Sequence, residues 1–125
     1  MQYTILCYHS EKVVGAWTPE QDAATMQRLT AVQDKLRQQH RLGPVVRLLP
    51  TSAAITLKKD REPPVVIDGP FAETKEQLLG FYVVNCASRE EALEIAQELG
   101  RANPGGSYEI RPIALFNPAE GPAAA

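Results

Sequence analysis

The sequence predicts one α+β domain in which two helices cover a single face of a β-sheet. Its 125 residues match the usual size of one domain, and 44% hydrophobic with 22% charged residues is an ordinary globular composition. Two segments begin with helix-capping patterns, and apolar segments typical of strands lie before, between and after them. Together these observations predict the α+β class.

The first half of the chain reads as a strand followed by a long helix. The segment 2–9 carries apolar groups on both faces, which is usual for a central strand. Residues 10–17 connect it to a Thr-Pro-Glu-Gln capping box at 18–21, with proline at the first helical position. The helix ends at Gly43-Pro44. The apolar stripe expected to face the core consists of Ala23, Met26, Leu29, Val32 and Leu36.

The second half of the chain predicts a hairpin, a strong strand, a second helix and a last strand. Pro63 and Pro64 cannot donate to a ladder, so the hairpin is expected at a sheet edge. A Ser-Arg-Glu-Glu capping box at 88–91 opens the second helix. Its buried side is expected to hold Ala92, Leu93, Ile95, Ala96 and Leu99. The expected strands are 45–49, 53–59 and 65–67, then 79–86, and finally 107–116, where Pro112 indicates a bulge or an edge.

This order, β-α-β-hairpin-β-α-β, corresponds to a ferredoxin-like split β-α-β plan with an inserted β-hairpin. Two helices cover only one face of the sheet, so the other face needs a cover. The same face of a second copy would supply it in a twofold homodimer. Residues 1–116 form this domain, and the Pro/Ala/Gly tail 117–125 is expected to be disordered. The apolar residues of which part is expected on the open face are Ile5, Cys7, Phe81, Val83 and Ile110.

Charge and motif content exclude several functions. A net charge of −2 provides no basic surface for nucleic acid or an anionic membrane. No apolar run approaches the ~20 residues of a membrane span, and the chain opens without a signal-peptide pattern. The sequence has no phosphate-binding glycine loop, no Cys-x-x-Cys and no His-Glu-x-x-His motif. We therefore expect a cytoplasmic protein with no membrane or direct nucleic-acid partner, no cofactor and no metal.

The cysteines and histidines leave alternatives open. If the first and third core strands run side by side and parallel, Cys7 and Cys86 near their ends are neighbours. They are then two buried free thiols or, against the trend in a reducing compartment, a redox pair. His9 ends the first strand and is either a hydrogen-bonded surface or interface imidazole or a general base. His40, at the end of the first helix, is expected to interact with the helix dipole.

The segment 68–76, Asp-Gly-Pro-Phe-Ala-Glu-Thr-Lys-Glu, resembles the DGPF motif of the YCII-related family. The following residues 77–82, the opening strand 3–8 and the closing strand 109–113 are similar as well. The resemblance implies a dimeric α+β barrel without an assigned reaction. It also implies an association with extracytoplasmic-function sigma factors and hence a regulatory role. A branch of the family is implied to use a His–Asp pair with the histidine on the first helix, whereas this helix has no histidine before His40.

The motif itself supports two interpretations. It is either a rigid turn with a solvated charge cluster, or a polar wall at the mouth of a cleft between sheet and helices. In the second interpretation Asp68, Glu73 and His9 are the candidate catalytic acids and bases. The candidate ligand-binding residues are Gly69, Pro70, Phe71, Lys75, Glu76, Tyr82 and Arg111. The function predicted from the sequence is thus a small-molecule-binding or regulatory homodimer, and the alternative is a small-molecule enzyme.

Overall fold

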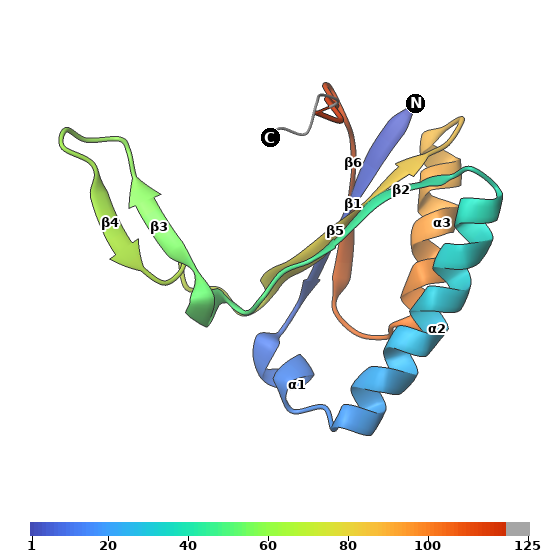
Figure 1. Ribbon diagram of the computed structural model, residues 1–125, viewed down its shortest axis with the longest axis horizontal. Coiled ribbons are helices and arrows are strands. Elements are labelled where there is room, and N and C mark those ends of the chain that lie inside the picture. Colours follow the sequence, from blue (N-terminus) through green and yellow to red (C-terminus); the bar gives the residue numbers. More distant parts are fainter. Residues whose placement is uncertain (120–125) are drawn as a thin grey trace.

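The computed structural model describes residues 1–119 and has the expected ferredoxin-like α+β fold with an inserted hairpin (Figure 1). A four-stranded sheet has the order β2-β5-β1-β6, and β3 and β4 form a separate two-stranded sheet. The helices α2 and α3 lie side by side on one face of the larger sheet (Figure 1). The elements are β1 (Gln2–His9), α1 (Glu11–Gly15), α2 (Pro19–Gln38), β2 (Leu42–Arg47), a 3-10 turn (Thr51–Ala53), β3 (Ile55–Lys58), β4 (Val65–Asp68), β5 (Gln77–Asn85), α3 (Arg89–Ala102) and β6 (Ser107–Pro112).

The central strands β1 and β5 are antiparallel, so the expectation of parallel neighbours is wrong. Cys7 pairs with Gly80, whereas Cys86 follows the opposite end of β5 and donates its N–H to the Met1 carbonyl at 3.0 Å. The two cysteines therefore lie at opposite ends of β1, and both are free thiols. The direction follows from the split β-α-β plan, because β5 inserts between β1 and β2 and opposes both.

The core lies between the larger sheet and the two long helices. Ile5 sits opposite Tyr82 on one side and Ile110 on the other, and all three belong to the helix-facing core. Because side chains alternate along a strand, Phe81 and Val83 point to the other face. Of the set from which a part was expected on the open face, Phe81 and Val83 lie there, whereas Ile5, Cys7 and Ile110 face the helices. The fully buried large side chains are Ile5, Leu36, Val84, Ile95 and Leu99.

The first capping box forms as expected. The Thr18 N–H donates to Gln21 Oε1 at 2.9 Å, and the Gln21 N–H donates to Thr18 Oγ1 at 3.1 Å. The buried stripe of α2 is rotated from the expected one, because Thr25 and Leu29 are buried while Ala23 is exposed and Met26 is 37% exposed. A threonine can enter this stripe because its hydroxyl accepts a hydrogen bond from Arg28.

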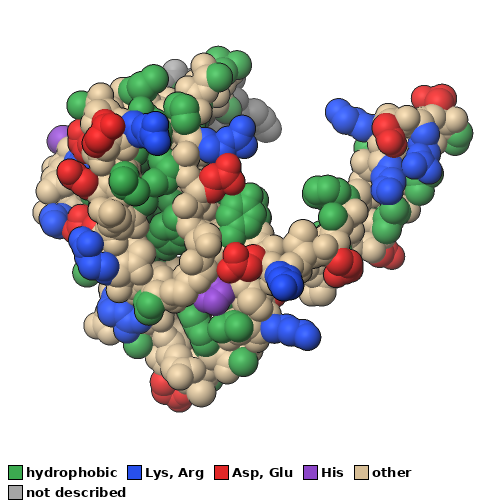
Figure 2. Space-filling view, turned by 180° about the vertical axis from the view of Figure 1, so that it is seen from behind, with side chains coloured by type: hydrophobic (Ala, Val, Ile, Leu, Met, Phe, Trp, Pro, Cys, Tyr) green, Lys and Arg blue, Asp and Glu red, His purple; other side chains and the backbone are tan. Residues whose placement is uncertain are grey.

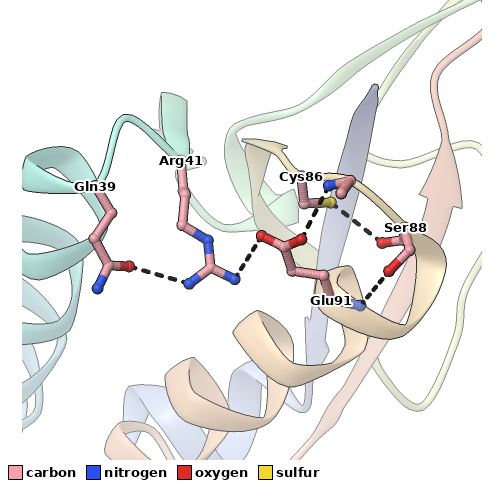
Figure 3. A network of polar contacts seen from close by, with 6 residues as sticks. Gln39, Arg41, Cys86, Ser88 and Glu91 are labelled. Atoms are coloured by element: carbon pink, nitrogen blue, oxygen red, sulfur yellow. Dashed lines mark hydrogen bonds and ion pairs between the residues drawn. The ribbon is translucent and has the colours of Figure 1, made fainter.

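The second capping box is only half formed. Ser88 Oγ accepts the Glu91 N–H at 3.1 Å, but the Glu91 carboxylate accepts the N–H of Ala87 at 3.0 Å instead of the Ser88 N–H. The other carboxylate oxygen of Glu91 pairs with Arg41 at 3.0 Å, which links the start of α3 to the start of β2 (Figure 3). On α3, Leu93 is exposed, although it was expected to be buried. Ala102, which was not in the expected set, is buried.

The end of α2 is a left-handed cap built on His40 rather than on Gly43. His40 has φ 57°, its N–H donates to Arg37 O at 2.9 Å, and the Arg41 N–H donates to Leu36 O at 2.9 Å. These two bonds form a Schellman motif, so the backbone of His40 ends the helix, and the interaction of its side chain with the helix dipole stays a prediction. Gly43 lies in an irregular part of β2, where the pairing with β5 shifts between Leu42 and Val45.

The hairpin β3–β4 projects away from the body of the molecule (Figures 1 and 2). Its root is held by α1, a short helix within the segment expected to be a connector. The Thr51 N–H and hydroxyl donate to the two carboxylate oxygens of Glu11 at 2.7 and 2.6 Å. Ser10 caps α1 by accepting the Val13 N–H at 3.3 Å.

The last strand is shorter than expected and ends at Pro112, on an edge of the sheet as the proline indicates. The disorder expected for the tail concerns residues 117–125, of which 120–125 lie outside the described residues.

Candidate functional site

A cavity of about 120 Å³ lies between the larger sheet and α2, and Val14 of α1 and Trp17 contribute to its lining. Its apolar wall combines strand, helix and loop residues from both ends of the chain. These residues include Val14, Trp17, Met26, Leu29, Val45 and Leu79. A cavity that is mainly apolar with a few polar groups is the usual form of a small-molecule site.

Gly80 fixes the cavity wall where β5 meets β2. A Cβ atom at this position would collide with the carbonyl oxygen of Val46. The missing side chain therefore allows the two backbones to approach closely. The irregularity of β1 between Cys7 and Tyr8 lies opposite Gly80, where the pairing register shifts.

Four polar side chains, Cys7, Tyr82, Asn103 and Tyr108, line the cavity. Cys7 and Tyr108 face each other across β1 and β6, and Tyr82 stands across β1 and β5 from Ile5. The side-chain amide of Asn103 donates to Tyr108 Oη at 3.3 Å. Asn103 Oδ1 is buried and has no hydrogen-bond partner among residues 1–119.

The ionisable groups in this cluster keep their protons at neutral pH. Burial raises the pKa of Cys7 to about 12, with a hydrogen bond to Tyr108 acting in the opposite direction. Burial is also the main reason that the pKa of Tyr82 and that of Tyr108 are raised. This end of the cavity is thus polar but uncharged.

His9 presents an N–H group beside this cluster. The Ser10 N–H donates to His9 Nδ1 at 2.7 Å, so Nδ1 is the acceptor and Nε2 carries a hydrogen atom. The edge-on ring of Trp17 lies 6.3 Å from the imidazole, centroid to centroid, at an interplanar angle of 86°. A base at this position would have to take its proton on Nδ1, which the Ser10 N–H occupies, and the geometry therefore favours a donor role for His9.

A glycine pair packs against His9. Gly105 and Gly106 have φ values of 95° and 75°, in the region that favours glycine. A Cβ at Gly105 would lie 2.6 Å from His9 Nε2, and one at Gly106 would collide with the Tyr8 carbonyl oxygen. The turn can approach the end of β1 only because both residues lack side chains.

The charged residues of the cavity are at its rim and neutralise each other. Arg47 pairs with Asp22 at 3.3 Å and also contacts the Met26 sulfur at 3.5 Å. The sequence did not identify Asp22, Arg47 or Asn103 as candidate site residues, because no local motif marks them. Their proximity depends on how β2 and α2 cross, which the pairing register of the strands sets.

Two of the candidate residues predicted from the sequence, His9 and Tyr82, line the cavity. The others do not contribute to its lining. Arg111 lies on β6 beside Glu109, with a separation of 4.0 Å between the nitrogen and the carboxylate oxygen. The DGPF segment lies at the root of the hairpin: Asp68 is the last residue of β4, and the candidates that follow it are Gly69, Pro70, Phe71, Glu73, Lys75 and Glu76. The catalytic and ligand-binding roles of these residues stay predictions.

Two hydrogen bonds attach the turn at Gly69 to β3 and to the residue that precedes β3. Gly69 has φ 104°, its N–H donates to the Ala54 carbonyl at 2.7 Å, and its own carbonyl accepts the Thr56 hydroxyl at 2.7 Å. Phe71 is 80% exposed. The motif thus forms the turn at the root of the hairpin, and it leaves the Phe71 ring exposed to solvent.

Within residues 1–119, no three His, Cys, Asp or Glu side chains are grouped to hold a metal ion. Among the helices of that segment, none is long and apolar enough to cross a membrane.

Comparison with known proteins gives a consistent family. The chain is 54% identical over 124 residues to an uncharacterized protein of Rhizobium meliloti (strain 1021), a match that covers 98% of this chain and 100% of that protein. A family model described as the YCII-related domain matches residues 1–117. The chain therefore belongs to the YCII-related family.

Proposed function

We propose that this chain is a small-molecule-binding module that works as a homodimer and holds its ligand in the cavity between the larger sheet and α2. The observation that supports the proposal is the cavity itself, at about 120 Å³. An apolar cavity of about 150 Å³ accommodates benzene. The expected ligand is therefore a single ring or a compound of similar size.

The polar end of the cavity favours a binding site over a packing defect. Buried polar atoms are nearly always hydrogen-bonded, whereas Asn103 Oδ1 has no partner within residues 1–119. Gly105 and Gly106, both at positive φ values, allow the turn that follows Asn103 to pack directly against His9 at the edge of the cavity. A ligand with polar atoms would satisfy the open groups.

Titration with cyclohexanone and phenol, followed by two-dimensional amide NMR, tests the binding function. The amide signals of Gly80 and Gly105 should shift in a saturable manner, because both residues line the cavity. Val14→Trp should abolish the shifts by filling the cavity from α1. Val13→Trp is the matched control, because Val13 is exposed on the same helix and does not line the cavity. Absence of saturable shifts with both probes would refute the binding function.

The homodimer is proposed because one face of the hairpin carries exposed apolar side chains, among them Ile55 and Val66. Ile55 is 71% exposed and Val66 is 66% exposed, and a lone two-stranded hairpin is only marginally stable in water. A second copy that packs against the hairpin and the open sheet face would form the dimeric barrel. Sedimentation equilibrium should give twice the mass of one chain, and Ile55→Asp with Val66→Asp should shift the molecule towards the monomer. A single-chain mass at high concentration would contradict the dimer.

The regulatory form of the proposal adds an extracytoplasmic-function sigma factor as a partner in the cytoplasm. It is supported by the DGPF motif and by the side chain of Phe71 within that motif, which is 80% exposed. The test is a pull-down with the sigma factor encoded beside this chain, using wild type and Phe71→Ser. Retention by wild type only is expected, and no complex at micromolar concentration would count against the partner.

The enzymatic alternative has less support. General acid–base catalysis needs a group that exchanges protons within reach of the substrate. Burial raises the pKa of Cys7, Tyr82 and Tyr108, which keeps them protonated, and Asp22 is paired with Arg47. Asp68 and Glu73 do not line the cavity. Binding without turnover is therefore the better supported role.

A further inference from the structure

The hydrogen-bonding phase of β6 follows from its pairing with β1. The two strands are antiparallel, and the Ile113 N–H donates to the Gln2 carbonyl at 3.0 Å, directly after the last paired residues. Hydrogen-bonded and non-hydrogen-bonded pairs alternate along an antiparallel ladder. Every second residue back from Ile113, which means Arg111 and Glu109, therefore directs its backbone groups at β1.

The residues between these point their backbone groups away from the sheet. They are Tyr108 and Ile110, each with an N–H and a carbonyl, and Pro112, which offers a carbonyl alone. β6 is the last strand of the larger sheet, and within residues 1–119 no strand pairs with its outer side. This edge can therefore accept a further strand.

The charges along the edge attract a copy of the same strand. Natural proteins commonly protect such edges with charged residues or proline. Here the charged residues are Glu109 and Arg111, which have opposite signs and share the face that points away from the helices. Their side chains are 54% and 67% exposed, and the closest nitrogen and oxygen atoms are 4.0 Å apart. Both charges are thus open to a second partner.

A twofold axis can join two β6 strands in only a few registers. Residues that direct their backbone groups outward have to lie opposite each other, so an axis near the middle of the strand passes through Glu109, Ile110 or Arg111. An axis through Glu109 sets two glutamates opposite each other, and an axis through Arg111 sets two arginines opposite each other. The axis through Ile110 instead sets each Glu109 opposite Arg111 of the second copy, which is the favourable combination.

We propose that two copies of this chain associate edge to edge through β6, in the register centred on Ile110, so that their larger sheets become continuous. In this register the Ile110 residues of both copies exchange N–H···O=C bonds. Each Tyr108 N–H donates to the Pro112 carbonyl of the second copy, so the missing N–H of the proline leaves no outward donor of the strand unpaired.

An apolar groove beside the edge supports this occupant. The groove has a volume of about 380 Å³ and is lined by Tyr3, Arg89, Leu93, Ile110 and Pro112. A twofold axis perpendicular to the sheet brings the two α3 helices to the same face of the continuous sheet. Leu93, which is 47% exposed on α3, would then turn its exposed surface towards the second copy.

The edge contact is separate from the proposed homodimer, which uses the hairpin and the open sheet face. Both contacts can form in one particle. A single strand edge with a short groove is a small interface, so we expect a dissociation constant of about 0.1–1 mM. The particle present in dilute solution should therefore double only as the concentration rises.

Sedimentation equilibrium of matched charge variants tests the proposal. Between about 0.01 and about 1 mM, the mass of the wild type should rise towards twice its value in dilute solution. Glu109→Arg and Arg111→Glu each set like charges opposite each other and should weaken the association about tenfold or more. An equimolar mixture of the two variants restores opposite charges in every pair and should associate like the wild type. Glu20→Arg is the control, because it makes the same change of charge on the exposed first turn of α2.

The register is measured on a mixture of isotope-labelled and unlabelled wild-type chains. Residues in a non-hydrogen-bonded antiparallel pair bring their Cα atoms to about 4.5 Å. An isotope-filtered NOE should therefore connect the Hα of Glu109 in one copy with the Hα of Arg111 in the other. An NOE between the Glu109 Hα atoms of both copies would instead show another register and overturn the proposal.

The outcomes separate the edge contact from the hairpin dimer and from ligand binding. A wild-type mass that stays constant up to about 1 mM would overturn the edge contact and leave the other two proposals intact. A mixture of the charge variants that associates no better than either variant alone would also overturn it. Loss of the doubling in Ile55→Asp with Val66→Asp would assign the association to the hairpin instead.

Discussion

Glu11 and Thr51 join the projecting hairpin to the body of the molecule. The Thr51 N–H and hydroxyl donate to separate oxygens of the Glu11 carboxylate at 2.7 and 2.6 Å. The backbone N–H of Glu11 in turn donates to the Gln77 side chain at 2.9 Å, at the start of β5. The short helix α1 is thereby connected both to the root of the hairpin and to the central sheet.

Removal of this contact should loosen the hairpin. Glu11→Ala leaves the Thr51 donors without their charged acceptor, and we expect a loss of about 1–2 kcal/mol in the free energy of unfolding. Hydrogen exchange should accelerate at residues 48–58. Lys12→Ala is the control, because Lys12 is exposed on the same helix. Unchanged exchange at the hairpin root in Glu11→Ala would show that the contact does not hold it.

The left-handed cap of α2 predicts a stabilising substitution. His40 has φ 57°, a conformation that costs a non-glycine residue about 1 kcal/mol. His40→Gly should therefore raise the free energy of unfolding by about 1 kcal/mol and the melting temperature by about 4 °C. Gln39→Gly should destabilise the chain, because Gln39 has φ −88° and gains nothing from glycine. Calorimetry of the two variants measures the contrast, and a lower melting temperature for His40→Gly would contradict it.

Two leucines of α3 should differ sharply in their effect on stability. Leu99 is fully buried, whereas Leu93 is 47% exposed. Leu99→Ala should cost about 2–5 kcal/mol through lost burial and the resulting cavity, and Leu93→Ala should cost less than about 1 kcal/mol. Urea denaturation provides both values. Similar losses in a dilute sample would mean that Leu93 is covered in solution.

Cys7 predicts a loss of stability in alkaline solution. Burial raises its pKa from 9.0 to about 12 in the folded chain. The unfolded chain thus loses this proton first as the pH rises, and the free energy of unfolding should fall between about pH 9 and pH 12. Below pH 9 both states hold the proton, so the group makes no difference there.

The measurement is the urea midpoint as a function of pH for wild type and Cys7→Val. The variant should lose stability less steeply above pH 9, because it lacks the buried thiol. A remaining slope is expected, since burial also raises the pKa of Tyr82 and of Tyr108. Identical slopes in the two proteins would contradict the assignment to Cys7.

The sequence predicted the elements that carry local signals. Thr18 and Gln21 mark the start of α2 through a reciprocal cap, and Ser88 marks the start of α3. The left-handed His40 was not predictable, because a histidine seldom adopts that conformation. The five-residue helix α1 is too short for a periodic pattern.

The candidate site was predicted only in part, for a related reason. His9 and Tyr82 stand on strands whose apolar pattern is visible, and both line the cavity. Tyr108 and Asn103 reach it because β6 pairs with β1 in a register that sets Tyr108 opposite Cys7. Such a register is a tertiary property, and no local motif encodes it. The DGPF segment was identified by its resemblance to a family motif, but it lies at the root of the hairpin and does not line the cavity.

Gly80 limits how this protein could be redesigned. The β5 backbone lies so close to the Val46 carbonyl there that no larger residue can replace Gly80. The cavity therefore cannot be made smaller by a substitution at this position. Any engineered change of ligand size has to come from the opposite side, by trimming or extending Met26 and Leu29 on α2. Directed evolution for new ligands should accordingly accumulate its substitutions on that helix.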